Sequence, residues 1–165
     1  MDTPPNPYRA LLGRWEAEGT AHLPDGGDRR HYWQIRFDSV LEDRAIQDVW
    51  ITPPRTGPNV GKSENWGPFS NQYGTTIRVY DKKVGGWRCL WIDPCADYRA
   101  ELVGRVVGGE IFQEGTGSDG ARVRWIFSDI RPESFRWRAE VSNDDGATWH
   151  RLLEMLARRT KAGGP

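Results

Sequence analysis

The chain has little cysteine: Cys89 and Cys95 are the only two. Two cysteines are too few for the disulfide framework of a small secreted domain, and their spacing is not that of a Cys-x-x-Cys pair. Its three histidines, His22, His31 and His150, form no His-x-His or His-x-x-x-His pair. We therefore expect no metal site and no cofactor, and we expect each histidine on an outer face.

Other features are missing as well. No apolar run is long enough to span a bilayer, and the N-terminal MDTPPNPY lacks the apolar core of a signal peptide. The 23 basic and 23 acidic residues give zero net charge, so no basic surplus points to nucleic acid. The sequence has no GxSxG, Walker, HExxH or strand-linked GxGxxG motif, which argues against common hydrolase and nucleotide chemistries. We expect a cytoplasmic monomer or homodimer that binds neither nucleic acid nor membrane.

What the chain has in abundance is tryptophan, with nine in 165 residues. Seven of them lie in short runs that alternate apolar and polar residues, which is typical of half-buried strands. A closed barrel gives so many large rings an interior to line. The pattern predicts an all-β fold, a single antiparallel meander barrel of eight to ten strands. The seven are Trp33, Trp50, Trp87, Trp91, Trp125, Trp137 and Trp149.

The length fits one domain, which we place at residues 8–160. Residues 1–7 are polar and rich in proline, and 161–165 read KAGGP, so both ends are expected to be flexible. Residues 8–12 could form one helical turn. Residues 53–74 have no periodicity and are expected to form a long loop at the mouth of the barrel. Because this loop carries Trp66, Phe69 and Tyr73, a lid or plug is favoured over a passive surface loop.

Strand phase places charged residues on the same face as indoles. Asp48 shares the phase of Trp50, and Arg78 shares the phase of Tyr80, which a hairpin brings near Trp87. If the indoles face the lumen, Asp48 and Arg78 lie there with them. A buried charged pair is costly unless it is satisfied, which makes it a functional candidate. The alternative is a salt bridge on the outer surface.

The segment SNDDGATW, residues 142–149, matches the Ser-x-Asp-x-Gly-x-Thr-Trp pattern of an Asp-box. Asp144 can cap backbone amides, Gly146 can take a positive φ, and Trp149 can pack under the turn. The pattern occurs once, in a chain too short for a propeller. It therefore favours a stapled hairpin over a glycosidase site.

The stretch LLGRWEAEG, with Gly13 and Trp15, resembles the Gly-x-Trp opening of the calycins, which include lipocalins, fatty-acid-binding proteins and nitrobindins. The stretches RAIQDVWI, TTIRVYDKKVGGWRCLW and FSDIRPESFRWRAEVSNDDGATW resemble an uncharacterised bacterial group of lipocalin-like single-domain proteins. The likeness covers most of residues 10–160 and implies a ligand-holding barrel, with Arg158 or Arg159 stacked on Trp15. It implies no known catalytic set. The third lipocalin motif is absent beyond the arginine, and no histidine is identified as a nitrobindin-style haem ligand.

Two classes of function remain open. The favoured one is a cofactor-free cyclase, isomerase or lyase acting on a small hydrophobic or aromatic metabolite. Asp48 would act as general acid or base with its pKa tuned by Arg78, and Tyr80 would donate a hydrogen bond. The alternative is a carrier or sensor without chemistry, or a haem-binding protein. In either case the expected ligand walls are Trp33, Trp50, Trp66, Trp91, Trp125 and Trp137.

Overall fold

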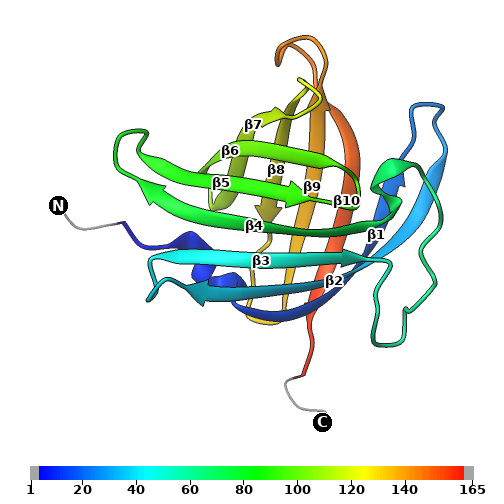
Figure 1. Cartoon of the computed structure of the whole chain (residues 1–165), viewed down its shortest axis with the longest axis horizontal. Coiled ribbons are helices and arrows are strands. Elements are labelled where there is room, and N and C mark those ends of the chain that lie inside the picture. The colour runs from blue at the N-terminus through cyan, green and yellow to red at the C-terminus, as the bar shows by residue number, and fades with distance from the viewer. Residues whose placement is uncertain (1–3, 162–165) are drawn as a thin grey trace.

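The computed structural model describes residues 4–161 as a ten-stranded closed β-barrel (Figure 1). Residues 1–3 and 162–165, which fall in the two ends expected to be flexible, lie outside the described residues. The elements are η1 (Pro7–Leu11), β1 (Gly13–His22), β2 (Asp28–Val40), β3 (Ala45–Thr52), η2 (Pro68–Ser70), β4 (Gln72–Asp81), β5 (Gly86–Asp93), β6 (Tyr98–Val107), β7 (Glu110–Gly117), β8 (Arg122–Ser128), β9 (Ser134–Ser142) and β10 (His150–Arg159).

Each strand pairs with its sequence neighbour in antiparallel fashion, and β10 returns to pair with β1. The closing register runs from Trp15 opposite Arg159 to Ala21 opposite Leu153. Closure gives every strand a neighbour on both sides, which limits the strand edges open to edge-to-edge aggregation. The predicted single antiparallel meander barrel is confirmed.

Burial alternates along the strands as the sequence pattern predicts. In β3, Ile46, Asp48, Trp50 and Thr52 are buried, while the residues between them are partly exposed. The indole of Trp50 therefore lies on the inward face of β3, and Asp48 lies on the same face. Arg78 is likewise buried on β4. The alternative, an ion pair on the outer surface, is excluded for these two residues.

The first turn and the last strand close one end of the barrel. Asn6 accepts a hydrogen bond from the Tyr8 amide, and η1 then buries Tyr8 and Leu11 completely. The Trp15 indole donates to the Leu11 carbonyl at 2.7 Å, and the Arg159 guanidinium lies 4.2 Å from the centre of the Trp15 ring. Of the two arginines expected to stack on Trp15, Arg159 is therefore the one that does.

The long loop follows an edge of β2 that β3 leaves uncovered. β3 pairs with β2 only from Gln34 onward, so the first half of β2 has free backbone groups on that side. Loop residues supply the partners: the Glu64 amide donates to the Arg30 carbonyl at 3.0 Å, and Ser63 Oγ accepts from the Tyr32 amide at 3.0 Å. These bonds anchor the loop before it reaches the mouth.

The loop ends at Asn71, three residues before the expected position, because β4 begins at Gln72. Tyr73 is consequently a strand residue on the outer face, where the Arg55 guanidinium lies 4.3 Å from its ring. Figure 1 shows the loop at the same end of the barrel as the β1–β2 hairpin, with η1 toward the other end. Within residues 4–161, neither helix has the length or apolarity to cross a bilayer.

Candidate ligand-binding site

A cavity of about 100 Å³ lies inside the barrel at the end covered by the loop. All six tryptophans expected to form ligand walls contribute to its lining. They come from β2, β3, β5, β8 and β9 and from the loop. The lining consists of Trp33, Trp50, Trp66, Phe69, Gln72, Trp91, Tyr98, Asp119, Val123, Trp125, Trp137, Ala139, Glu140, Val141, Leu152 and Leu153.

The indoles touch one another and form a continuous wall. The ring centres of Trp50 and Trp137 are 5.0 Å apart, and those of Trp125 and Trp137 are 6.2 Å apart. Trp91 meets Trp125 edge to face at 6.0 Å. These spacings are typical of favourable aromatic pairs. The wall is therefore held in place by its own packing.

The loop closes over this wall through Trp66. The Trp66 indole donates a hydrogen bond to Nε2 of His31 at 3.2 Å. Its ring packs against Phe69 at 6.0 Å, and Phe69 meets Tyr98 of β6 edge to face at 5.2 Å. The backbone amide of Trp66 also donates to Ser70 Oγ at 2.7 Å. Residues 65–70 therefore form a compact cover joined to two strands.

His31 corrects the expectation that every histidine lies on an outer face. Its side chain is fully buried and packs edge to face against Trp33 at 4.7 Å. Burial lowers its pKa to about 4, so the ring is neutral near pH 7. Since Nε2 accepts from Trp66, the proton of the neutral ring is on Nδ1. The sequence could have indicated this burial, because His31 stands two residues before Trp33 on one strand and therefore shares its face.

Polar groups are few and lie mostly at the rim. Gln72 accepts a hydrogen bond from the Trp33 indole at 3.3 Å. The Tyr98 hydroxyl and the Asp119 carboxylate both lie over Gly117, where a Cβ would collide with each. Burial, together with the charge of Asp119, raises the pKa of Tyr98 to about 12. The hydroxyl therefore stays protonated and can donate a hydrogen bond.

Glu140, the other charged residue of the lining, is paired with two arginines that lie outside the cavity. Arg124 Nε donates to one of its carboxylate oxygens at 2.7 Å, and Arg138 Nε donates to the other at 2.9 Å. Burial opposes ionisation of Glu140, but these arginines hold its pKa below the ordinary value. Neither arginine lines the cavity.

The Asp48–Arg78 pair lies toward the end closed by η1 and does not line the cavity. Asp48 Oδ2 is 2.7 Å from Arg78 Nη1, and both side chains are almost completely buried. Asp48 Oδ1 accepts from the Thr76 amide at 2.7 Å, and Arg78 Nε donates to Gln113 at 2.8 Å. Burial alone would lower the pKa of Arg78, but the Asp48 charge raises it on balance, so the guanidinium stays charged.

The third expected catalytic residue, Tyr80, is half-buried beside Trp87, with ring centres 5.5 Å apart. It does not line the cavity either. The structure thus brings Asp48 and Arg78 into contact with each other but places neither beside the indole wall. Their immediate neighbours are Tyr8, whose ring lies 4.8 Å from the guanidinium, and Gln113.

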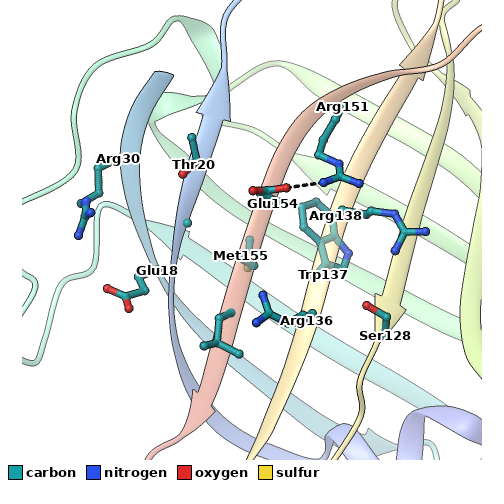
Figure 2. Close-up of a pocket in the computed structure, with 12 residues that line it drawn as sticks. Glu18, Thr20, Arg30, Ser128, Arg136, Trp137, Arg138, Arg151, Glu154 and Met155 are labelled. Carbon is teal, nitrogen blue, oxygen red and sulfur yellow. Dashed lines mark hydrogen bonds and ion pairs between the residues drawn. The ribbon is translucent and has the colours of Figure 1, made fainter. Parts of the chain in front are cut away.

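A larger hollow of about 520 Å³ lies on the outer surface of β1, β9 and β10 (Figure 2). Arginine and glutamate side chains line it, and Arg151 pairs with Glu154 at 2.7 Å, as the dashed line marks. Arg138, which also lines it, is bound to Glu140. The lining of the hollow is mainly charged and polar, so it is a poor site for an apolar ligand, although Trp137 lines both the hollow and the cavity.

The Asp-box segment forms the expected hairpin between β9 and β10. Asp144 accepts from the Thr148 amide at 2.8 Å, and Ser142 Oγ accepts from the Gly146 amide at 2.8 Å. Gly146 has a φ of 86°. The Thr148 hydroxyl and amide lower the pKa of Asp144 to about 2. The carboxylate is used to staple the turn.

The lining does not suit a His-, Cys- or Met-ligated haem, because it contains no histidine, cysteine or methionine. A volume near 100 Å³ is also too small for a tetrapyrrole in this conformation. Within residues 4–161, no three His, Cys, Asp or Glu side chains gather as metal ligands.

No family model and no curated protein matches the chain. Solved structures do match. The crystal structure of Rv2717c from M. tuberculosis has a TM-score of 0.63 at 14% identity, covering 93% of this chain and 94% of that one. The S-type phycobiliprotein lyase CPES from Guillardia theta has a TM-score of 0.62 at 13% identity, covering 94% and 92%. At such identities the likeness shows the fold alone, and that fold is consistent with the calycin resemblance.

Proposed function

We propose that this chain binds a small aromatic molecule inside the barrel, against the indole wall and beneath the loop. One observation carries the proposal: six tryptophans from five strands and the loop converge on one small cavity. Aromatic side chains supply a large contact area at low cost in side-chain entropy, and such pockets typically hold apolar ligands.

Cavity size narrows the ligand. A cavity of about 150 Å³ lined by apolar side chains admits benzene. At about 100 Å³ this cavity can take no more than a single ring, with any substituent directed toward the mouth. A carrier or sensor role follows directly, since neither needs chemistry in the cavity. The phycobiliprotein lyase CPES from Guillardia theta has a similar fold, but at 13% identity that likeness is too distant to transfer an activity.

Toluene is the probe for this proposal, because it is one apolar ring with a small substituent. We expect it to change indole fluorescence and to raise the melting temperature in a concentration-dependent manner. Trp125→Leu should weaken toluene binding about threefold to tenfold, because one aromatic contact is lost. The measurement is a fluorescence titration with calorimetry.

The matched control is Trp149→Leu, which removes an indole from the β9–β10 hairpin outside the cavity. This variant should bind toluene like the unmodified protein. Equal loss in the two variants, or no binding by the unmodified protein, would contradict the proposal.

A second candidate function is acid–base catalysis on the bound metabolite by a cyclase, isomerase or lyase. The observation in its favour is the almost fully buried Asp48–Arg78 pair, with Asp48 as acid or base and Tyr80 as a hydrogen-bond donor. This role requires Asp48 to reach the ligand, so the cavity must extend toward η1 during turnover.

Asp48→Asn separates catalysis from a structural role for the pair. The substrate would first be identified among metabolites bound to the protein. Under the catalytic hypothesis, its turnover by the variant is lower by a factor of about 10²–10⁴, while its affinity is kept. Under a structural role, turnover by the folded variant is unchanged. In both cases stability falls by about 3–5 kcal/mol, because Arg78 loses its buried partner, and urea unfolding measures that loss.

A further inference from the structure

The charge at the cavity mouth points to the kind of aromatic molecule that enters. Of the sixteen lining residues, the two that carry charge, Asp119 and Glu140, are both acidic, and none is lysine or arginine. A ligand with a carboxylate or phosphate would therefore meet no cation on the lining. The indole faces add to this bias, because the face of an aromatic ring carries partial negative charge.

The two carboxylates are in different situations. Glu140 is paired with Arg124 and Arg138. Asp119 uses Oδ1 to accept from the Ala121 amide at 3.1 Å, which shapes the β7–β8 turn. Asp119 makes no ion pair with any residue in 4–161. Its charge at the rim is therefore available to a ligand.

Tyr98 lies beside that charge. Its hydroxyl and Asp119 Oδ1 share the space over Gly117, and its ring packs on Phe69 of the cover. An ammonium at this point would meet a carboxylate, a phenol oxygen and the faces of aromatic rings. Cationic ligands in proteins are commonly held by such combinations of rings and carboxylate.

The indole N–H groups do not oppose this preference. Those of Trp33 and Trp66 already donate to Gln72 and His31. The other lining indoles donate to no residue in 4–161 and could serve a neutral acceptor on the ligand ring. A neutral N–H donor favours an acceptor atom but does not compensate for the repulsion between an anionic ligand and Asp119.

From these contacts we infer that the cavity selects a cationic aromatic molecule, with its ring against the indoles and its ammonium at Asp119 and Tyr98. The inference rests on the proposed function and adds the ligand's charge to it. An anionic aromatic is disfavoured by the carboxylate at the rim, and a neutral one binds through the ring alone.

Three probes of nearly one shape isolate charge: phenyltrimethylammonium, tert-butylbenzene and benzenesulfonate each carry a tetrahedral head on a phenyl ring. We expect the cation to bind about tenfold more tightly than the neutral probe, from its contacts with rings and carboxylate. The anion should bind most weakly. Calorimetry and indole fluorescence on the full chain give the three affinities.

Asp119→Asn should weaken binding of the cation about threefold, a small factor because the carboxylate is exposed. The affinity for tert-butylbenzene should not change. The control Glu42→Gln removes one negative charge near the β2–β3 turn, away from the cavity, and should change neither affinity. Of the three probes, only the cation should bind more weakly at high salt.

The outcomes distinguish the two proposals. If none of the three probes binds, the proposed binding function itself fails. If tert-butylbenzene binds as tightly as the cation, or Glu42→Gln has the effect of Asp119→Asn, binding stands and selection by charge is wrong.

Discussion

His31 joins the interior of the barrel to the cover. It is buried on β2 between the indoles of Trp33 and Trp66, and its Nε2 accepts the hydrogen bond that holds Trp66. Protonation would turn that acceptor into a donor and place a charge among apolar rings. The low pKa of His31 therefore means that the folded state favours the neutral form of the ring.

This preference predicts a loss of stability in acid. The pKa is about 4 when folded and about 6.5 when unfolded, so the unfolded chain binds more protons between those values. Stability from the neutral ring is complete above pH 6.5 and is lost as pH falls toward 4. Between pH 7 and 4.5 we expect His31 to account for about 2 kcal/mol.

Urea unfolding of the unmodified protein and of His31→Gln, at both pH values, measures this contribution. The glutamine variant keeps a polar side chain but cannot titrate, so its pH dependence should be shallower by that amount. His150→Gln is the control, because His150 is exposed. Parallel curves for His31→Gln and the unmodified protein would show that His31 does not contribute.

At the scale of an element, the loop from residue 53 to 71 has two parts with different roles. The first part supplies backbone partners to the uncovered half of β2, through Ser63 and Glu64. The second part, residues 65–70, carries Trp66 and Phe69 to the cavity. The hydrogen bond from Trp66 to His31 and the packing of Phe69 on Tyr98 join this second part to the barrel.

Trp66→Ala should therefore make a bound ligand leave faster. Removing the ring and its hydrogen bond opens the cover, so dissociation of phenyltrimethylammonium or toluene should accelerate about tenfold, with a smaller change in association. Stopped-flow fluorescence measures both rates. Val60→Ala, a change at an exposed loop position outside the cavity, is the control. Unchanged dissociation from the Trp66 variant would mean that the loop does not cover the site.

At the scale of the whole molecule, the barrel divides its interior into two unlike halves. The half near η1 is filled by Tyr8, Phe37 and Phe127 around the guanidinium of Arg78. The half near the loop keeps a small cavity among indoles. Trp15, held by Arg159, seals the filled half. A ligand taken from solvent would therefore enter past the loop.

The outer surface carries a hollow of about 700 Å³ whose lining includes Tyr73 and Ile92. Several surface arginines are paired with acidic neighbours, and the exposed apolar residues Tyr73, Val79, Leu90 and Ile92 lie on the outward faces of β4 and β5. Whether the chain is a monomer or a homodimer stays a prediction.

The sequence alone determined the barrel and its inward phase. Period-two alternation is a local property, so it marks each strand and identifies the face shared by Trp50 and Asp48 without knowledge of the neighbours. The Gly-x-Trp opening likewise indicated the closed end at Trp15. Short turns between the runs made a meander the simplest order.

Only the tertiary structure decided the depth at which each inward residue lies. Asp48 and Trp50 share a phase, yet only Trp50 lines the cavity, because strand tilt and η1 set the level at which side chains meet. The burial of His31 beneath Trp66 depends on contacts across 35 residues of chain. Alternation gives a face but no position along the barrel axis, so the separation of ion pair from cavity could not be predicted.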